Sequence, residues 1–440
     1  MARRHSGASP RVGYIPRQID ARLRAELDTW PSVVITGPRG VGKTTTALQV
    51  AESVIDLSQP QQREVFMLDM ESALRVAPKP VLIDEWQQAP DVLWVVKKLI
   101  DQDAMTGFII AGSSHLRPNN QNDSNQWPLV HRGVTLEMHP LTVAEKRRKG
   151  FHSVPGRLAD MSAASGHQGG YGLYDYIDIA LEGGYPAYLD VATPSTRRAQ
   201  MQSAVRDIVR LDAATGRIDH RKMLDFLQVY AANSSELINQ TTLAEHADIS
   251  RASAEKYEQA LHDSYIVSQL PSWHRTLSSR TGKRPKRFVN DTGMWAAILG
   301  VGREDVRADP KLVGNLMETF VVSQIRAQQI ASRSLHTLYH YRDQAGREID
   351  LLLEDRRDRT LVAVEVKASS TITRHDTRHL EWLRGQLDTA GPHRPMRFSR
   401  GVVLYSGPQT VKVSDRVWAT PISALWEGRS RPHRVAPGPT

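Results

Sequence analysis

The sequence predicts a multidomain α/β protein, because three regions of the chain differ in the spacing of their apolar residues. From about residue 14 to 215, short apolar runs alternate with helical stretches, a pattern typical of a parallel sheet covered by helices. Residues 218–270 have a mostly helical pattern, and strand-like runs return from about 310 to 426. The length of 440 residues fits several domains of roughly 100–200 residues each. We expect three domains, at 1–217, 218–285 and 286–428, and a disordered tail at 429–440.

The composition excludes several classes of chemistry. The chain has no cysteine, which excludes disulfides, thiolate zinc sites, iron–sulfur clusters and cysteine nucleophiles. Lys and Arg number 57 against 48 Asp and Glu, a formal net charge of +9 that is compatible with nucleic-acid binding. We find no signal-peptide pattern and no run approaching the ~18 apolar residues of a membrane span. We therefore expect a soluble, cytoplasmic protein with no membrane partner.

Four short runs supply the expected strands of the first region, namely Ser32–Thr36, Val65–Met70, Val81–Asp84 and Phe108–Ala111. Residues 44–54 follow the first strand and are expected to form a helix. Residues 118–127 are almost wholly polar and follow the last strand, so we expect an exposed, mobile loop. A partner contact and a tolerated insertion are both open for this loop.

The turn after the first strand predicts a phosphate site. Residues 37–44 match the P-loop pattern G-x-x-x-x-G-K-[ST], with an apolar strand before it and a helix after it. Glycines let backbone amides face phosphate oxygens, Lys43 reaches the β and γ phosphates, and the Thr44 hydroxyl binds Mg²⁺. ATP and Mg²⁺ are the expected ligands. The candidate nucleotide-binding residues are Gly37, Pro38, Arg39, Gly40, Val41, Gly42, Lys43, Thr44 and Thr45.

Two acids at the end of the strand Val81–Asp84 support this site. In P-loop proteins the first acid, here Asp84, holds Mg²⁺ together with the P-loop hydroxyl. The second acid, Glu85, is placed to polarise the attacking water. Ser113 follows the strand Phe108–Ala111 and is a candidate contact for the γ-phosphate or that water, with a simple turn as the alternative.

The middle of the chain predicts a helix-turn-helix. Residues 243–250 have the pattern of a helix, a turn and an N-cap, and Ser250 caps a second helix. The strand-like residues 266–273 that follow suggest the wing of a winged helix. DNA contact through Arg251 and Lys256 is one interpretation. A structural spacer is the other, because the second helix also carries several acids.

The segment 271–290, called the basic connector below, contains six cations and no acid. We expect it to bind nucleic acid through phosphates, and packing of these side chains against acidic faces of the first or the C-terminal domain is the alternative. The six cations are Arg275, Arg280, Lys283, Arg284, Lys286 and Arg287.

A resemblance to a known family rests on a series of segments in the same order. The first are ITGPRGVGKTT, LIDEWQQAP, FIIAGSS and LEMHPLTVAE, and the later ones are LEGGYPAYL, LAEHADIS, GKRPKRFVNDTGM, GNLMETFV, GREIDLLL, VEVKAS and ATPISALW. The sequence resembles the AAA+ ATPases of bacteria and archaea that carry a C-terminal domain of unknown function related to the PD-(D/E)xK nuclease fold. The resemblance covers nearly the whole chain. It implies a P-loop AAA+ ATPase domain with a lid, a winged-helix-like middle domain and a restriction-endonuclease-like C-terminal domain.

The same resemblance suggests an arginine finger. The family often shows Gly-Arg shortly before its Pro-Leu motif. Here His131 and Arg132 take this place, with Arg132 eight residues before Pro140. Arg132 is therefore the candidate that would stabilise charge on the nucleotide of a neighbouring subunit in a homo-oligomer. Because His replaces Gly at this point, a plain surface arginine is the alternative.

The C-terminal region predicts a second site. Its expected strands are Leu338–Tyr341, Ile349–Leu353, Leu361–Lys367 and Val402–Tyr405. Side chains alternate along a strand, so Glu365 and Lys367 point the same way, and a hairpin with the preceding strand would bring Asp350 beside them. Two carboxylates and a lysine are what a metal-dependent phosphodiesterase needs, with Mg²⁺ or Mn²⁺ on the acids. Glu318 matches a helical acid that completes such sites in the nuclease fold.

Two function hypotheses follow. The first is an ATP-dependent enzyme that acts on or near DNA and has metal-dependent nuclease capacity. The second is a nucleotide-switched DNA-binding or signalling module with an inactive nuclease fold. They differ at Asp350, Glu365 and Lys367. Zinc-protease and serine-hydrolase chemistry are excluded, because the histidines show no HExxH spacing and Ser113 lacks a nucleophile elbow.

Overall fold

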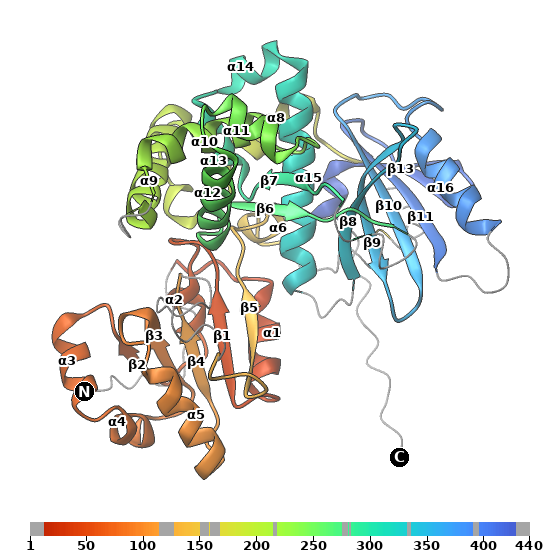
Figure 1. Ribbon diagram of the computed structural model, residues 1–440. Coiled ribbons are helices and arrows are strands. Elements are labelled where there is room, and N and C mark those ends of the chain that lie inside the picture. Colours follow the sequence, from red (N-terminus) through yellow and green to blue (C-terminus); the bar gives the residue numbers. More distant parts are fainter. Residues whose placement is uncertain are drawn as a thin grey trace, which may run out of the picture.

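A computed structural model of the chain shows two large sheets joined by a helical region that contains a small two-stranded sheet (Figure 1). The first sheet and its helices lie at the lower left of Figure 1, the helical region above them, and the second sheet at the right. The structure describes residues 13–113, 127–149, 158, 168–213, 218–274, 280, 283–331, 336–389 and 396–427. Residues 118–126 of the loop expected at 118–127, Arg275 and the expected tail at 429–440 lie outside these residues.

The first sheet has five parallel strands in the order β2-β3-β4-β1-β5. Every residue of the three central strands is buried, as expected for a sheet covered on both faces. The strands are β1 (Ser32–Thr36), β2 (Ser53–Asp56), β3 (Val81–Asp84), β4 (Phe108–Ala111) and β5 (Gly133–Glu137). The accompanying helices are α1 (Ile19–Leu27), α2 (Lys43–Ala47), α3 (Pro60–Leu68), α4 (Met70–Val76) and α5 (Val92–Asp103).

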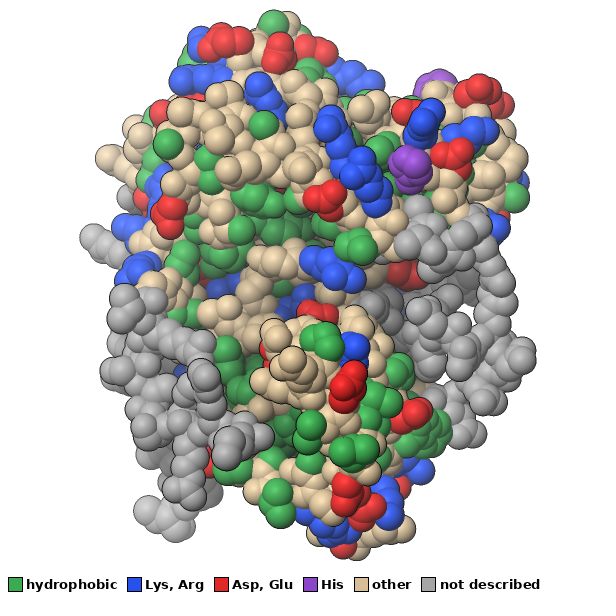
Figure 2. All heavy atoms as spheres, turned by 90° about the vertical axis from the view of Figure 1, so that its left-hand side faces the viewer, with side chains coloured by type: hydrophobic (Ala, Val, Ile, Leu, Met, Phe, Trp, Pro, Cys, Tyr) green, Lys and Arg blue, Asp and Glu red, His purple; other side chains and the backbone are tan. Residues whose placement is uncertain are grey.

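The strand predicted at Val65–Met70 is wrong. The segment instead ends α3 and begins α4, and Asp69 between them caps α4 by accepting a hydrogen bond from the Ser72 amide. Only Phe66 of the apolar run is buried, whereas Val65, Met67 and Leu68 are exposed and Met70 is half-buried. Figure 2 shows apolar side chains at the surface in the lower part of the molecule, where the first sheet and its helices lie.

The helix predicted at residues 44–54 is wrong in its second half. Helix α2 ends at Ala47, and Ser53–Asp56 forms β2, which pairs in parallel with β3. The β-branched Val54 and Ile55 lie on this edge strand, and such residues pack well on a half-buried sheet surface.

The helical region contains α6 (Val143–Lys146), α8 (Leu173–Glu182), α9 (Pro194–Ala213), α10 (His220–Ala232), α11 (Gln240–His246), α12 (Arg251–Asp263), α13 (Thr292–Leu299) and α14 (Arg303–Ala308). The two helices expected around residue 247 are confirmed as α11 and α12, capped by Asn239 and Ser250. Strand β6 (Val267–Leu270) follows and pairs antiparallel with β7 (Lys286–Val289). This small sheet crosses the domain boundary expected at 285/286, and a winged-helix fold stays a prediction.

The second sheet has six strands in the order β12-β13-β11-β10-β9-β8. All four predicted strands are confirmed, and the hairpin expected before residue 367 is formed by β9 and β10. Helix α15 (Pro310–Ala331) covers one face and α16 (Arg378–Asp388) the other. The strands are β8 (His336–Arg342), β9 (Glu348–Asp355), β10 (Thr360–Lys367), β11 (Arg397–Tyr405), β12 (Val411–Ser414) and β13 (Val417–Pro421).

Helix α15 joins the parts of the molecule. It contacts α1 beside the first sheet, α8 of the helical region and β10 of the second sheet (Figure 1). One apolar core runs continuously from the helical region through α15 to the inner face of the second sheet. Among the described residues, no helix is both long enough and apolar enough to cross a lipid bilayer.

Candidate nucleotide-binding site

The P-loop follows β1 as a tight turn built on glycine. Gly37, Gly40 and Gly42 have φ values of 140°, 76° and 100°, a region that glycine enters without steric cost. Gly37 also lies against the chain after β5, where a Cβ atom would be only 2.4 Å from the Met138 carbonyl oxygen. A larger residue at Gly37 would therefore push the P-loop away from β5.

Lys43 begins α2 and its ammonium group lies inside the turn. Its Nζ donates to the carbonyl oxygens of Gly37 at 2.9 Å and Pro38 at 2.8 Å, and the side chain is buried. Burial lowers the pKa of Lys43 to about 8, although the nearby carboxylates of Glu85 and Asp84 oppose this. An anionic ligand beside this ammonium group would stabilise its charged form, as a phosphate does in the predicted role.

Thr44 and Asp84 meet as the sequence predicts. The Thr44 hydroxyl donates to Asp84 Oδ1 at 3.1 Å, which joins the start of α2 to the end of β3. Burial raises the pKa of Asp84 to about 6. Mg²⁺ is commonly held by one or two carboxylates with waters and substrate phosphates, so this pair of oxygen ligands fits it. No group of three or more metal-ligating side chains exists in the part of the chain that the structure describes.

Glu85 and Ser113 lie at the ends of neighbouring strands. Glu85 has φ = 52°, an uncommon conformation for glutamate. Its carboxylate accepts a hydrogen bond from the side-chain amide of Gln87. Gly112 packs so closely on this turn that a Cβ would be 2.5 Å from the Gln87 side chain. The next residue, Ser113, is buried, and its hydroxyl has no hydrogen-bond partner among the described residues.

Arg17 is hydrogen-bonded to the P-loop backbone, and the sequence did not predict this role. Its guanidinium donates to the carbonyl oxygens of Val41 at 2.9 Å and His139 at 2.6 Å, and it pairs with Glu145 at 3.1 Å. Glu145 also closes a capping box with Thr142 at the start of α6. The T-x-x-E pattern at 142–145 is a readable signal for that box, whereas no local pattern reveals Arg17.

Arg132 lies at the opposite end of β1 from its own P-loop. Its carbonyl oxygen accepts from the amide of Ser32, where β1 begins, and the P-loop follows the other end of the strand. The guanidinium pairs with Asp101 on α5, with Nη2 2.8 Å from Oδ2. A role at the nucleotide of a neighbouring subunit stays a prediction.

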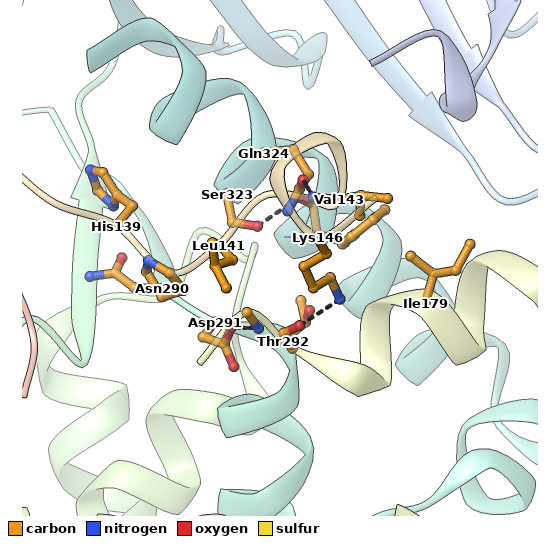
Figure 3. A pocket seen from close by; sticks show the side chains of 14 residues that line it. His139, Leu141, Val143, Lys146, Ile179, Asn290, Asp291, Thr292, Ser323 and Gln324 are labelled. Atoms are coloured by element: carbon orange, nitrogen blue, oxygen red, sulfur yellow. Dashed lines mark hydrogen bonds between the residues drawn. The ribbon is translucent and has the colours of Figure 1, made fainter. Parts of the chain in front are cut away.

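The segment after β5 connects this site to the helical region. The Leu141 amide donates to the Gly184 carbonyl at 2.7 Å, and the Gly184 amide donates to Asp291 Oδ2 at 2.7 Å. A Cβ on Gly184 would be 2.3 Å from the Leu141 carbonyl oxygen, so the close contact requires glycine. Figure 3 shows these segments around a small cavity, with Lys146 and Gln324 at its edge.

Lys286 lies at the centre of the C-terminal acids, which corrects its predicted role. It was expected to bind nucleic acid, but its ammonium is 1% exposed and pairs with Glu318 at 2.6 Å, Glu348 at 2.7 Å and Asp350 at 3.3 Å. Burial alone would lower the pKa of Lys286, and the three carboxylates raise it well above its usual value. Burial also raises the pKa of Glu318 to about 8.

Glu365 and Lys367 complete this acidic cluster. Lys367 Nζ is 3.2 Å from Glu365 Oε2, and the Asp350 Oδ2 atom accepts from the Val366 amide at 2.9 Å. The sequence therefore predicted correctly that these three side chains converge. Both Asp350 oxygens already have partners, Lys286 and the Val366 amide, whereas the buried Glu365 Oε1 has none among the described residues. The described side chains form no three-ligand metal group here, so a metal at this place stays a prediction.

Two more cations of the basic connector form ion pairs, with Arg287 buried and Arg280 half-buried. Arg280 Nη2 is 2.7 Å from Glu354, and Arg287 Nε is 2.7 Å from Glu258. Their predicted role in nucleic-acid binding is wrong. The alternative of packing against an acidic face of the first or the C-terminal domain is confirmed for Arg280, whereas Arg287 pairs with an acid of the helical region. Lys283 and Arg284 are exposed.

The predicted DNA-contacting residues of α12 are accessible. Lys256 is exposed, and Arg251 is exposed but pairs with Glu255 one turn along the helix, at 3.0 Å. The buried face of this helix carries Ala254, Tyr257 and Leu261, which pack into the continuous core.

Comparison with family models divides the chain into three matched segments. Residues 29–146 match an AAA domain, residues 173–305 match a domain of unknown function (DUF8612), and residues 313–425 match another domain of unknown function (DUF4143). The AAA match contains the P-loop, Asp84, Glu85 and Arg132. The acidic cluster is divided, because Lys286 falls in the second segment and its carboxylate partners fall in the third.

Two relatives are similar to nearly the whole chain. They are uncharacterized proteins of Mycobacterium tuberculosis and Mycobacterium bovis, each 27% identical over 418 residues, which cover 93% of this chain and 84% of the relative.

Solved structures give weaker similarity. A Walker-type ATPase of Pyrococcus abyssi has a TM-score of 0.40 at 13% identity and covers 66% of this chain and 97% of its own. The Holliday-junction branch-migration motor RuvB of Thermotoga maritima has a TM-score of 0.28 at 17% identity, over 60% of this chain and 93% of its own. The family match and the P-loop geometry together show that the chain carries an AAA-type P-loop domain.

Proposed function

We propose that this protein binds and hydrolyses ATP with Mg²⁺ at the P-loop. The observation that carries the proposal is the contact between Thr44 and Asp84, 3.1 Å apart at the start of α2 and the end of β3. These two residues are 40 positions apart in sequence, and their contact supports a role as the paired oxygen ligands of a P-loop Mg²⁺ site. The family match to an AAA domain supports the same proposal.

Each residue of the site has a distinct role in the proposed reaction. The backbone of residues 37–42 and the Lys43 ammonium bind the β and γ phosphates, where the positive charge offsets that of the phosphoryl oxygens. Glu85 orients the attacking water, and Gln87 holds the Glu85 carboxylate by a hydrogen bond. Thr44 and Asp84 would hold Mg²⁺, which would supply positive charge to offset that of the phosphate oxygens.

Equilibrium binding of a fluorescent ATP analogue tests the assignment of the site. Lys43→Ala should weaken ATP binding strongly, because Lys43 is the buried cation within the P-loop. Lys97→Ala on α5 is a control that removes a cation outside the P-loop. Equal affinity of the two variants for ATP would refute the assignment.

A second proposal concerns the C-terminal domain. We infer that it acts as a nucleotide-switched module without nuclease chemistry, and Lys286 is the observation that favours this. Its ammonium already pairs with Glu318, Glu348 and Asp350, three of the carboxylates from which a metal site would be built. The unpartnered Glu365 Oε1 is the feature that favours the metal-dependent nuclease instead.

Metal binding and DNA cleavage distinguish these two functions. Under our proposal, calorimetry detects no Mn²⁺ or Mg²⁺ binding that depends on Glu365, and no single- or double-stranded DNA is cut with either ion. Cleavage that Glu365→Gln abolishes, while ATP binding is unchanged, would establish the nuclease. DNA binding without cleavage would agree with a switched DNA-binding module, with Lys256, Lys283 and Arg284 as exposed cations for phosphates.

A further inference from the structure

The helical region contains a cavity that the proposed ATP site does not use. It lies between α8, α9 and α13 and has a volume of about 470 Å³. Small-molecule sites in proteins commonly measure roughly 300–1,000 Å³, so this cavity has the size of a ligand site. Most of its accessible lining is apolar and includes Ile179, Leu181, Met201 and Val301.

The two acids at this cavity already have cationic partners. Asp178 pairs with Arg303, with 3.3 Å between Oδ1 and Nε, and Glu182 pairs with Lys146 at 2.5 Å. These carboxylates are therefore compensated within the protein. Neither acid is therefore available to pair with the remaining arginines of the cavity.

Three arginines line the cavity without pairing to any carboxylate in the described part of the chain. Arg197 donates to the Tyr188 carbonyl at 2.9 Å, and Arg147 lies over the Tyr171 ring, 4.8 Å from its centroid. Neither contact neutralises the positive charge. The cavity therefore combines an apolar surface with uncompensated positive charge from α6 and α9.

Of the three arginines, Arg198 is the one most available to bind a ligand. The structure shows neither a hydrogen bond nor an ion pair for its side chain within the described ranges, and it is half-buried at the cavity. Its Nη1 atom lies over Gly302, where a Cβ would be only 2.4 Å away. The missing side chain at Gly302 makes room for this guanidinium group.

We propose that this cavity binds a small organic anion, with a carboxylate or phosphate group on an apolar body. Arg198 pairs with the anionic group, because the planar guanidinium suits both oxyanions and has no competing partner among the described residues. Ile179, Met201 and Val301 contact the apolar body. No residue that the proposal places at ATP lines this cavity, so the two sites are separate.

Calorimetric titration of the full-length protein with decanoate, decyl phosphate and decanol tests the proposal. The three probes share an alkyl chain and differ in the head group, so the neutral decanol isolates the contribution of charge. At least one anion should bind about tenfold more tightly than decanol, since a charge-assisted hydrogen bond contributes that much. Decanoate alone would assign a carboxylate ligand, decyl phosphate alone a phosphate ligand, and both the shared anion site.

Two arginine variants on α9 make the test specific. Arg198→Gln should weaken binding of the preferred anion about tenfold and leave decanol binding unchanged. Arg206→Gln is the matched control, because Arg206 is exposed on the same helix and does not line the cavity. Thermal unfolding confirms that both variants are folded. Equal affinity for decanol and the anions, equal loss in the two variants, or no anion binding at all would overturn the proposal, and none of these outcomes bears on the ATP site.

Discussion

At the scale of single residues, burial shifts two charged groups of the P-loop site in a direction that an ATP–Mg²⁺ ligand would reverse. It lowers the pKa of Lys43 to about 8 and raises the pKa of Asp84 to about 6. Both shifts mean that the charged forms are poorly solvated in the folded chain. A phosphate beside Lys43 and a cation beside Asp84 would each restore the charged form.

Asp84→Asn should therefore stabilise the nucleotide-free protein at neutral pH. A carboxyl group whose pKa is higher in the folded than in the unfolded chain destabilises the fold once the pH exceeds both values. For Asp84, with an unfolded value near 4 and a folded value of about 6, the penalty is at most about 3 kcal/mol above pH 6. It disappears as the pH falls below 4. The difference in Tm between variant and wild type, measured from pH 7.5 to 4, should shrink accordingly.

Asp101→Asn is the control for this comparison, since pairing with Arg132 lowers the pKa of Asp101. It should leave Tm unchanged or reduce it at neutral pH. A lower Tm for Asp84→Asn at pH 7.5 would show that the Asp84 carboxylate is stabilised in the folded chain, contrary to our account.

Lys286→Met should destabilise the protein by about 3–5 kcal/mol, because it leaves the carboxylates of the cluster without their cation. Adding Asp350→Asn should recover part of the loss, because Asp350, whose pKa is lowered beside Lys286, then no longer adds an uncompensated charge. Lys283→Met is the control, as Lys283 is exposed in the same basic connector. Thermal unfolding followed by circular dichroism measures all three. If Lys286→Met unfolds at the same temperature as Lys283→Met, the cluster does not depend on its lysine.

At the scale of secondary-structure elements, the sequence predicts the buried central strands of the first sheet well and its edge strands poorly. β1, β3 and β4 are wholly buried and appear in the sequence as short apolar runs between turns. β2 is a half-buried edge strand with a mixed pattern, and it was missed. The run at 65–70 has strand-like composition, but most of its side chains face solvent on two helices, which local pattern cannot reveal.

The candidate sites also contain some residues that the sequence predicts and others that it does not. The P-loop is a local motif, so its glycines, Lys43 and Thr44 were readable from the sequence. The convergence of Asp350, Glu365 and Lys367 followed from the alternation of side chains along paired strands. The pairing of Lys286 with Asp350 joins residues 64 positions apart, and no local pattern indicates it.

Arg17 gives a prediction at this scale, because it joins three elements of the ATP site: the P-loop, the segment after β5 and α6. Arg17→Met should raise KM for ATP about tenfold, since the loss of hydrogen bonds from a charged group frees the P-loop backbone. Arg24→Met on the exposed side of α1 is the control and should leave KM unchanged. Equal KM values in both variants, with Tm reduced only for Arg17→Met, would show that Arg17 stabilises the fold without positioning the site.

At the scale of the whole molecule, contacts connect the proposed ATP site with the C-terminal domain. The segment after β5 is hydrogen-bonded to Gly184 and Gln324, and Gln324 belongs to α15, which reaches the second sheet. A change at the P-loop therefore has a continuous set of contacts to the C-terminal domain. Such contacts permit coupling, and only measurements on both sites demonstrate it.

Arg132 gives the prediction for assembly. A finger that acts in trans lets a Lys43→Ala subunit supply Arg132 to the active site of an Arg132→Ala subunit. A mixture of the two variants should then hydrolyse ATP faster than the sum of the separate variants, and light scattering should show an oligomer with ATP. Additive rates, or a monomer with full activity, would show that Arg132 is a surface arginine paired with Asp101.

The central claim is that the P-loop site hydrolyses ATP with Glu85 orienting the water, and phosphate release measured beside ATP binding tests it most directly. Glu85→Gln should keep the affinity for ATP and lower kcat by about 10²–10⁴-fold, the usual contribution of a general base. Glu71→Gln on α4 is the control, because Glu71 lies on that helix in surface ion pairs. Mg²⁺-dependent phosphate release by wild type and Glu71→Gln, with ATP bound but not hydrolysed by Glu85→Gln, is the predicted result. No phosphate release by the wild type, or full turnover by Glu85→Gln, would contradict the account.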